Sequence, residues 1–553
     1  MALWSSTLLN HLSVALRTLT RSQLLIGLLF GLFFCCVAWV SGLLNWRTAA
    51  KLAGWWLLMS GAGVVGLSAI NHSKKTSWFL WWLTAMFVVD IGVQGVIRHF
   101  FGSAPTPSLL VEVLVNTNTK ESFEFLREHW RSIAASLVFA LAVLIIAWFV
   151  FLQREYHSRS YSVLTAGVLW LILIGVGFNP TMLRQNPVTR WPLLLKHHSE
   201  AQRGIAQMDQ RLREVESQKD RWRIQMVDRS PKTVVLVIGE SGNRENWGLY
   251  GYARDTTAPL SKTLHELSGQ NMLFRDAWSS DAFTQPSLTK ALTPATRERP
   301  DAWLDTPAVT QMAREAGFST AWLSNQMSQE GWFDALARRT DFRAFVNHGN
   351  WRDSSSTDYS LLPVLDIWLR SQKAERELIV VHLMGQHFYY HQRCTKEISP
   401  FSDVDDVVRK KLMEQQRLPH IVTARDEYDN ATYCGADVLA QIMRMTQTLR
   451  ADRPVGVVFF SDHGQEVGHH GNFSGHTQKH LSGYSIPMLL WVNDHWVKRY
   501  PEIYAERAFR SDWMDHVVQG LLGIRSAWYD ARYDILAPDY APAESAMPVL
   551  SHD

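Results

Sequence analysis

The sequence predicts an α/β domain with a mostly parallel sheet covered by helices, following an N-terminal module of five transmembrane helices. Three observations predict this arrangement. Five long apolar runs lie in the first 180 residues, short apolar runs alternate with helical patterns after about residue 231, and metal-type side chains directly follow three of those short runs. The chain therefore divides into a membrane module, 1–180, a linker, 181–230, and an α/β domain, 231–553.

The five N-terminal runs are long enough to cross a bilayer, which requires about 20 mostly apolar residues. The first run lacks a small-residue cleavage site, and a second run follows it closely, so it is not a removable signal peptide. Because soluble proteins rarely bury five such runs, we expect all of them to be transmembrane helices. They cover 24–44, 52–70, 78–97, 133–152 and 161–178.

Charged residues do not fix the orientation of this module. The loops on one side carry six basic residues, which are Arg17, Arg21, Lys74, Lys75, Arg154 and Arg159. Those on the other side also carry six, which are Arg47, Lys51, Arg98, Lys120, Arg127 and Arg131. The positive-inside rule therefore leaves both orientations open. The net charge of +3, without an arginine-rich stripe, speaks against nucleic acid as a partner.

Two polar segments accompany the predicted helices. Segment 98–132 mixes apolar and charged residues at helical spacing, which predicts an amphipathic surface element. Pro180 ends the fifth helix, because proline cannot continue it, and the charged helical pattern of 190–226 predicts a linker helix. Asp90, inside the third run, is costly in hydrocarbon, and we expect it to pack against other helices.

Five short apolar runs predict buried strands, because strands covered on both faces read as continuous apolar sequence. They cover 233–238, 320–324, 378–383, 455–460 and 486–492. In open α/β sheets, functional side chains gather beyond the carboxyl ends of the strands. Here Glu240 follows the first run, His387 follows the third, and the fourth is followed by Asp462 and His463.

The residue types at these strand ends indicate a metal site. A single aspartate after a strand is more often a helix cap than a ligand. Carboxylates and an imidazole that follow neighbouring strands are, as a set, typical ligands of a divalent transition metal, above all zinc. The sequence therefore predicts a zinc site formed by Glu240, Asp462 and His463.

The hydroxyl-rich segment 279–293 is the candidate for a nucleophile. It predicts a helix with Pro286 in its first turn, and a helix N-terminus offers unpaired N–H groups to phosphate. Thr284 lies at this start, where its side chain either caps the helix or acts as a nucleophile beside the metal. The two roles can coexist.

Several motifs occur in a fixed order behind the five apolar runs. They are GES with GLYGYARDTTAPL, SSDAFTQPSLTKALT, HLMGQH, EYDNATYCGADVL and SDHGQEVG. Together the motifs and runs resemble the phosphoethanolamine transferases of Gram-negative bacteria, within the alkaline phosphatase and sulfatase superfamily. The resemblance covers nearly the whole chain. It implies a multi-pass protein of the bacterial inner membrane with a catalytic domain, 231–553, in the periplasm.

The resemblance also implies roles for particular residues. One catalytic zinc ion would be held by Glu240, Thr284, Asp462 and His463, with Thr284 also serving as the nucleophile. The implied reaction transfers phosphoethanolamine from phosphatidylethanolamine to an envelope glycolipid or glycan, through a phosphothreonine intermediate.

Further substrate-binding residues follow from the same resemblance. His387 matches a histidine that contacts the donor phosphate or a second zinc ion. A late histidine is expected about a dozen residues after SDH, where His476 is preferred and His470 is its rival. The surface segment NTNTKE resembles the donor-headgroup segment, although solvated polar residues on an interfacial helix are an equal alternative. Its best matches are Asn116, Thr117 and Glu121.

Cysteine usage and the nucleophile segment bear on the acceptor. Cys394 and Cys434 are the only cysteines of the soluble part, and a periplasmic location predicts a disulfide between them, with two free thiols as the alternative. The lipid A enzymes of this family carry several disulfides, and the ending LTKALT is closer to the branch that modifies lipopolysaccharide core sugars. Lipopolysaccharide is the expected acceptor, and lipid A, a core sugar and other glycans stay open.

The sequence also bears on three other functions. The segment TQPSL echoes the sulfatase pattern C-x-P-S-R, but a threonine replaces the oxidised residue and Leu288 replaces the arginine, which argues against a sulfatase. A phosphoglycerol transferase of the same superfamily would share the architecture and differ in its donor. A non-catalytic envelope scaffold is disfavoured because the predicted ligand set is intact.

Overall fold

The computed structural model describes residues 23–41, 44, 46–69, 73–101, 130–153, 163–177, 186–190, 210–327, 332–347, 357–372, 374–395 and 397–550. It divides into two compact units, one of Met1–Phe100 with Ala104–Ala201 and one of Phe101–Ser103 with Gln202–Asp553. Three predicted donor-binding residues lie outside the described residues. They are Asn116, Thr117 and Glu121.

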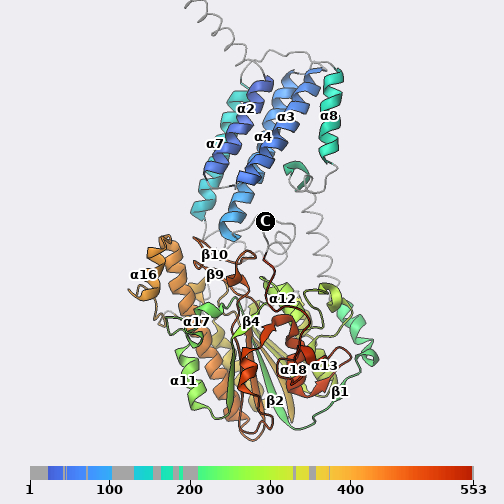
Figure 1. Cartoon of the computed structure of the whole chain (residues 1–553), viewed down its shortest axis with the longest axis vertical. Helices are drawn as coiled ribbons and strands as arrows, with labels where there is room; N and C mark the ends of the chain where they lie inside the picture. Colours follow the sequence, from blue (N-terminus) through green and yellow to red (C-terminus); the bar gives the residue numbers. More distant parts are fainter. Residues whose placement is uncertain are drawn as a thin grey trace, which may run out of the picture. The chain divides into compact units, whose positions relative to one another are not determined.

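The first unit contains a helix at each predicted apolar run (Figure 1). The helices are α2 (Gln23–Val40), α3 (Trp46–Ala69), α4 (Ser73–Phe101), α7 (Trp130–Phe151) and α8 (Val163–Gly177). Among the described residues, Trp46–Ala69 and Lys74–Gly95 are long and apolar enough to cross a membrane. The other apolar helices are shorter, and they are Leu24–Val40, Ser136–Phe151 and Val163–Val176. That all five cross the bilayer remains a prediction.

A paired carboxylate lies inside the first unit. Asp90 on α4 is fully buried, and its Oδ1 accepts a hydrogen bond of 2.7 Å from Nη1 of Arg190. Its Oδ2 accepts one of 2.6 Å from Nε2 of Gln94 on the same helix. A charge among apolar helices is tolerated when it is paired in this way, so Asp90 has the packing role that the sequence suggested.

A seven-stranded sheet forms the centre of the second unit, with strand order β3-β11-β8-β2-β7-β5-β6. Five neighbouring strands are parallel, namely β8 (Val455–Ser461), β2 (Lys232–Gly239), β7 (Arg376–His382), β5 (Ser319–Met327) and β6 (Phe342–Asn347). Strand β11 (Met488–Val492) is antiparallel to both of its neighbours, β8 and the edge strand β3 (Gln270–Phe274). The predicted mostly parallel sheet is therefore mixed, with one reversed strand.

Burial explains which strands the sequence revealed. Every residue of β2, β8 and β11 is buried, and each of these strands reads as a continuous apolar run. The edge strands β3 and β6 are only partly buried and were not predicted, because their mixed sequences QNMLF and FRAFVN lack such a run.

Helices cover both faces of the sheet (Figure 1). One face carries α11 (Ala258–Glu266), α15 (Leu361–Ser371) and α17 (Pro419–Leu449), and the other carries α13 (Val309–Glu315) and α18 (Met514–Leu522). Val235 and Val237 of β2 pack with apolar residues of α15 and α17 in one core. Because β2, β7 and β8 are parallel, their carboxyl ends meet at one edge of the sheet.

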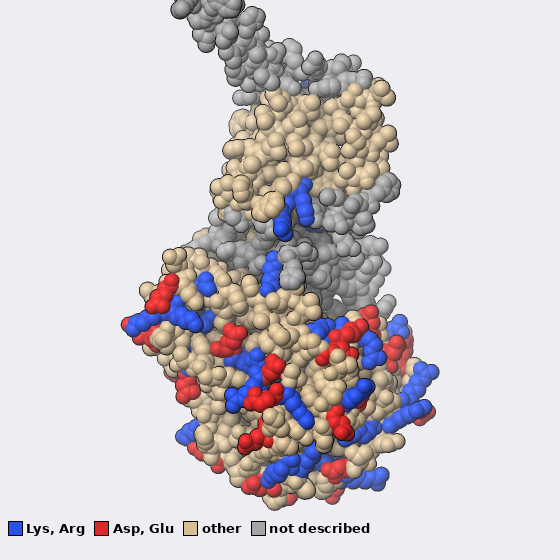
Figure 2. All heavy atoms as spheres, viewed as in Figure 1, with Lys and Arg blue, Asp and Glu red and all other residues tan. Residues whose placement is uncertain are grey.

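Shorter elements surround this framework. The helices are α12 (Thr284–Ala291), α14 (Trp332–Ala337) and α16 (Val407–Glu414). Small strand pairs are β1 (Gln225–Met226) with β13 (Ile524–Arg525), β9 (Glu466–Val467) with β10 (Ser474–Gly475), and β4 (Asp276–Trp278) with β12 (Ala508–Arg510). On the face drawn in Figure 2, charged side chains of both signs are intermixed over the second unit, whereas they are sparse on the first.

Candidate active site

Three side chains converge at the carboxyl edge of the sheet. Glu240 directly follows β2, and Asp462 and His463 directly follow the adjacent strand β8. All three are fully buried, and they offer ligand atoms that lie within 4.8 Å of one another. His463 Nε2 lies 3.3 Å from Glu240 Oε1 and 3.4 Å from Asp462 Oδ2. The structure thus brings the three predicted metal ligands together.

Backbone groups hold the Asp462 carboxylate in place. Ser241 adopts a left-handed conformation with φ of 57°, and its N–H donates a 2.9 Å hydrogen bond to Asp462 Oδ1. The N–H of His463 donates to the same oxygen at 2.7 Å. The other oxygen, Oδ2, is buried without a hydrogen-bond partner in the described part of the chain. Asp462 therefore directs one unsatisfied oxygen into the cluster.

The His463 ring is oriented in the same way. Its Nδ1 donates a 2.8 Å hydrogen bond to the carbonyl oxygen of Gly464, because a carbonyl can only accept. Nε2 then faces Glu240 and Asp462, and once deprotonated it offers a lone pair to a metal. A backbone partner that fixes the tautomer is typical of a histidine that ligates a metal.

The two carboxylates and the imidazole change one another's protonation. Burial and the charge of Glu240 raise the pKa of Asp462 to about 8. Burial lowers the pKa of His463, but Asp462 and Glu240 outweigh it and raise that pKa to about 9. In Glu240, burial raises the pKa, but the hydrogen bond and charge of His463 outweigh it and hold the pKa below its usual range.

This cluster fits a zinc ion. Two carboxylates and an imidazole nitrogen are ordinary zinc ligands, and the unsatisfied Asp462 Oδ2 lies among them. A divalent cation would displace the protons bound by this cluster. Its charge would balance the negative charges of the two buried carboxylates.

Thr284 lies beside the cluster as the first residue of α12. The cap residue of this helix is Phe283, and no side chain caps it, so the predicted capping role of Thr284 is wrong. Its hydroxyl lies 3.1 Å from Oε1 and 3.2 Å from Oε2 of Glu240, and 3.2 Å from Nε2 of His463.

Two serines near Thr284 tie α12 to the end of β8. Ser279 and Ser287 both donate to the carbonyl oxygen of Asp462, at 2.5 and 2.6 Å, and their hydroxyls lie 3.0 Å apart. Neither was singled out in the sequence, although both belong to the hydroxyl-rich segment that was.

Two of the three candidate histidines lie near the cluster. The ring centroid of His476 lies 4.6 Å from that of His463. The same ring stacks on Phe283 with a centroid distance of 5.3 Å. His387 follows β7, and the N–H of the preceding residue, Gln386, donates a 2.8 Å hydrogen bond to the carbonyl oxygen of Glu240. Burial lowers the pKa of His387 to about 4 and that of His476 to about 3, so both imidazoles are neutral at pH 7.

The rival histidine has other partners. His470 Nδ1 lies 2.9 Å from Oε2 of Glu466, and its ring stacks on that of His480 at 4.5 Å. His470 is therefore hydrogen-bonded to Glu466 of the β9–β10 hairpin. Of the two candidate late histidines, His476 is the one that lies beside His463.

Residues that sequence reasoning did not single out support Glu240 from behind. Gly385 has φ of 49°, and a Cβ there would lie 2.7 Å from the carbonyl oxygen of Glu240 and 2.8 Å from its nitrogen. Asp358 accepts hydrogen bonds from the N–H groups of Met384 and Gly385, at 2.7 and 2.9 Å. Gln326 donates to the carbonyl oxygen of Leu383 at 2.8 Å. Only the glycine in HLMGQH carried a signal for this loop.

A disulfide joins Cys394 to Cys434 on α17, across 40 residues of sequence. It connects the segment that follows β7 and His387 to the helix that also carries Tyr428. The loop next to the site is thereby tied covalently to the main helix of one sheet face.

The chain is similar in sequence to several known proteins. A family model described as Sulfatase matches residues 232–524. The chain is 26% identical over 461 residues to phosphoethanolamine transferase EptC of Escherichia coli (strain K12), covering 77% of each chain. It is 28% identical over 324 residues to phosphoethanolamine transferase CptA of Salmonella typhimurium, covering 56% of this chain and 54% of CptA.

Two solved structures are similar as well. The C-terminal periplasmic domain of EcEptC from Escherichia coli, in complex with Zn, matches with a TM-score of 0.54 and 27% identity over 58% of this chain and 90% of that domain. The integral membrane protein lipooligosaccharide phosphoethanolamine transferase A (EptA) from Neisseria meningitidis matches with a TM-score of 0.60 and 18% identity. That second match covers 94% of this chain and 98% of EptA, and it shows that the fold is shared.

Proposed function

This chain belongs to the sulfatase family, and from that premise we propose that it is a zinc-dependent transferase that moves phosphoethanolamine from phosphatidylethanolamine to a lipopolysaccharide or another envelope glycan. The relatives EptC and CptA confirm the resemblance to phosphoethanolamine transferases that the motifs indicated. Both the core-sugar and the lipid A type of acceptor are compatible with this proposal.

The position of Thr284 carries the proposal. Its hydroxyl lies within 3.2 Å of both a carboxylate, Glu240, and an imidazole, His463, at the start of a helix. A hydroxyl beside a proton acceptor and a metal-type ligand set is suited to attack phosphorus and to carry the transferred group between two steps. The N–H groups and positive dipole at the start of α12 suit the phosphoryl oxygens of the donor.

The residues that would hold zinc are Glu240, Asp462, His463 and Thr284. The ion, when bound, lowers the pKa of a coordinated hydroxyl and offsets negative charge on the phosphoryl oxygens. Ser241 and Gly464 keep Asp462 and His463 in the orientation that this requires.

In the first step, the oxygen of Thr284 attacks the donor phosphorus, and the bond from phosphorus to diacylglycerol breaks. The Thr284 proton passes through Glu240 to the leaving oxygen, so diacylglycerol departs as the alcohol. In the second step, an acceptor hydroxyl attacks phosphorus, and the bond from phosphorus to the Thr284 oxygen breaks. The acceptor proton passes to that oxygen and restores the free threonine. His476 would relay this proton, because its ring lies beside His463 and its Nδ1 is buried without a partner in the described part of the chain. His387 would contact the donor phosphate or a second zinc ion.

A membrane module suits this chemistry, because the headgroup of a phospholipid donor lies at the bilayer surface. We propose that all five apolar helices cross the bacterial inner membrane and that residues 231–553 lie in the periplasm, where the Cys394–Cys434 disulfide is stable. In the surface segment 98–132, Asn116, Thr117 and Glu121 would bind the donor headgroup, with the Glu121 carboxylate paired to the ethanolamine ammonium.

The test uses purified full-length protein with phosphatidylethanolamine labelled in its headgroup and lipopolysaccharide as acceptor. Transfer of label together with release of diacylglycerol supports the proposal. Phosphatidylglycerol is the matched donor, and its exclusive use would identify a phosphoglycerol transferase instead. Transfer from neither lipid would favour the scaffold. Mass spectrometry of envelope glycolipids from cells with and without the protein would then locate the acceptor group.

A further inference from the structure

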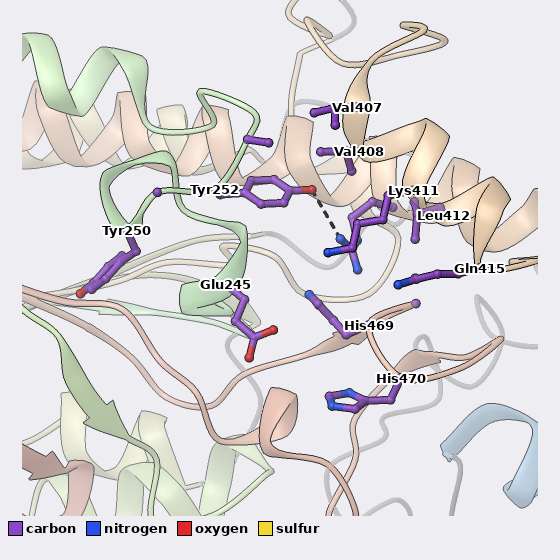
Figure 3. A pocket seen from close by; sticks show the side chains of 14 residues that line it. Glu245, Tyr250, Tyr252, Val407, Val408, Lys411, Leu412, Gln415, His469 and His470 are labelled. Atoms are coloured by element: carbon purple, nitrogen blue, oxygen red, sulfur yellow. Dashed lines mark hydrogen bonds between the residues drawn. The ribbon is translucent and has the colours of Figure 1, made fainter.

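A cavity lies in the α/β unit, and neither Glu240 nor Thr284 lines it. It has a volume of about 550 Å³ and opens between the turn after β2, helix α16 and the tip of the β9–β10 hairpin (Figure 3). Tyr252, Lys411, Gln415 and His469 point toward one another across it. No step of the proposed transfer uses these side chains.

Two cations line this cavity without an ion pair. Arg425 is only 5% exposed, and its guanidinium donates to the carbonyl oxygen of Val467 at 2.7 Å and to the Tyr252 hydroxyl at 3.4 Å. Among the residues that the structure describes, no carboxylate oxygen lies within 4.0 Å of Arg425 or of Lys411. The single carboxylate in the lining is Glu245. Arg425 and Lys411 thus give the cavity two positive groups with no carboxylate at ion-pair distance, which favours an anionic occupant.

The carboxylates nearest to Arg425 are engaged elsewhere. Asp429 accepts a 2.9 Å hydrogen bond from Arg254 and others from Asn246 and Tyr252. Glu466 accepts from both the N–H and the ring of His470, at 2.9 Å each. Both carboxylates act on Arg425 only through longer-range attraction. A guanidinium with a nearby ammonium is the combination that proteins use for phosphate.

The rest of the lining suits a sugar ring. Tyr252 contributes an aromatic ring to the lining, and Val407, Val408 and Leu412 form an apolar wall on α16. Apolar and aromatic walls with a few polar groups typify small-molecule sites, and a sugar offers both an apolar ring face and hydroxyls. The zwitterionic donor headgroup fits less well, because its ammonium would face Lys411 and Arg425.

Three segments connect this cavity to the active site. Glu245 follows Glu240 by five residues, which span at most about 18 Å of extended chain. His469 lies at the tip of a hairpin whose two ends carry His463 and His476. Arg425 lies one turn before Tyr428 on α17, and the Tyr428 hydroxyl donates to the carbonyl oxygen of Ser241 at 2.6 Å. The cavity and the metal-ligand cluster therefore lie on shared segments of the α/β unit.

We propose that this cavity binds a phosphorylated sugar of the acceptor glycan. This inference rests on the proposed function for the identity of the glycan. Arg425 and Lys411 would bind the phosphate, and Tyr252 would pack against the ring.

The test measures binding of glucose 1-phosphate to the full-length protein by calorimetry, with glucose and inorganic phosphate as the two comparison probes. Glucose 1-phosphate is expected to bind more tightly than either. Lys411→Gln, an exposed position on α16, should weaken binding about tenfold, which is the loss of one charged hydrogen bond. The matched control is Lys410→Gln, because Lys410 is adjacent, pairs with Asp405 at 3.3 Å and does not line the cavity.

Equal weakening by both lysine substitutions, no weakening by Lys411→Gln, or equally tight binding of inorganic phosphate would overturn the proposal. Arg425→Gln should weaken binding more than Lys411→Gln does. If the Arg425→Gln variant does not fold, the result for Lys411→Gln alone tests the proposal. In the transfer assay, Lys411→Gln should raise the KM for a phosphorylated glycan about tenfold relative to Lys410→Gln. The calorimetry does not depend on transfer, so failure of this proposal and failure of the proposed function are distinguishable.

Discussion

The hydroxyl of Tyr428 on α17 donates a 2.6 Å hydrogen bond to the carbonyl oxygen of Ser241, from which it is separated by 187 residues. The same hydroxyl accepts a 2.8 Å hydrogen bond from the N–H of Asn243. These bonds fix the turn in which Ser241 adopts φ of 57° and directs its own N–H to Asp462. The position of the candidate metal ligands therefore depends on a second layer of residues, which makes definite predictions possible.

The tight approach of Gly385 to Glu240 predicts that Gly385→Ala disrupts the site. The new Cβ would meet backbone atoms of Glu240 at 2.7 and 2.8 Å, and these cannot move without displacing the carboxylate. We expect transfer activity and zinc affinity to fall at least about tenfold, as for the loss of a supporting partner of a metal ligand. Gly317→Ala is the matched control, since Gly317 also has positive φ but its Cβ would meet no atom closer than 4.0 Å. Equal losses in both variants would contradict a specific role for Gly385.

Removal of a predicted metal ligand should remove metal and activity together. Asp462→Ala is expected to lower zinc affinity more than about a hundredfold, because a first ligand contributes more than the partners that orient it. Metal content by mass spectrometry and transfer activity are the measurements, with circular dichroism to verify folding. Asp452→Ala, an exposed carboxylate paired with Arg453, serves as the control. Full activity after exhaustive chelation would contradict the zinc assignment.

Zinc affinity should rise with pH. Without metal, the cluster of Asp462 and His463 holds at least one proton at neutral pH, because the pKa of each group is raised by its buried, charged surroundings. Zinc must displace this proton, so affinity should increase about tenfold per pH unit from pH 6 to 8 and level off at higher pH. Competition with a chelator across this range measures it. An affinity that does not change between pH 6 and 8 would rule this coupling out.

The same shifts affect the metal-free fold. Both groups bind protons more tightly in the folded state than at their ordinary pKa values, so their contribution to stability is complete below about pH 4. That contribution is lost as the pH rises to about 9.

The disulfide predicts a thiol count and a stability change. In denatured, unreduced protein, alkylation should label Cys35 and Cys36 but neither Cys394 nor Cys434. The bond closes a loop of 40 residues, which corresponds to about 4 kcal/mol in the chain-entropy model. Replacing both Cys394 and Cys434 by serine should lower the free energy of unfolding by about that amount. Alkylation of either one before reduction would refute the bond.

The strands and metal ligands that could be predicted are those marked by an apolar run in the sequence or directly following one. Strands β2, β7 and β8 are buried on both faces and read as apolar runs, and Glu240, Asp462 and His463 follow them directly. The reversed direction of β11 was not predictable, because an apolar run reads alike in a parallel or an antiparallel strand. The partly buried edge strands β3 and β6 gave no run at all.

The residues that hold the site in place from behind are not marked by any pattern in the neighbouring sequence. Asp358 and Tyr428 reach the site from a short helical turn and from α17, and their partners Gly385 and Ser241 lie far away in the sequence. Only the folded chain reveals such pairs. Thr284 was identified from the start of its helix, but its hydroxyl faces Glu240 and does not cap the helix, because the cap position belongs to Phe283.

The nucleophile assignment is tested by trapping the intermediate. With phosphatidylethanolamine labelled in its headgroup and no acceptor, label should accumulate on Thr284 and be lost slowly to water. Thr284→Ala should abolish labelling while most zinc stays bound by Glu240, Asp462 and His463. Thr284→Ser should keep partial activity, since it retains the hydroxyl but loses the methyl group that restricts its rotamer.

Peptide mapping of the labelled protein tests the central claim most directly. The account predicts a single phosphoethanolamine group on the peptide that contains Thr284. Nearby hydroxyls offer the alternatives, and among them Ser241 donates to Glu240 Oε1 at 3.0 Å. Label on Ser241, Ser280 or Thr289, with Thr284→Ala still active, would contradict it.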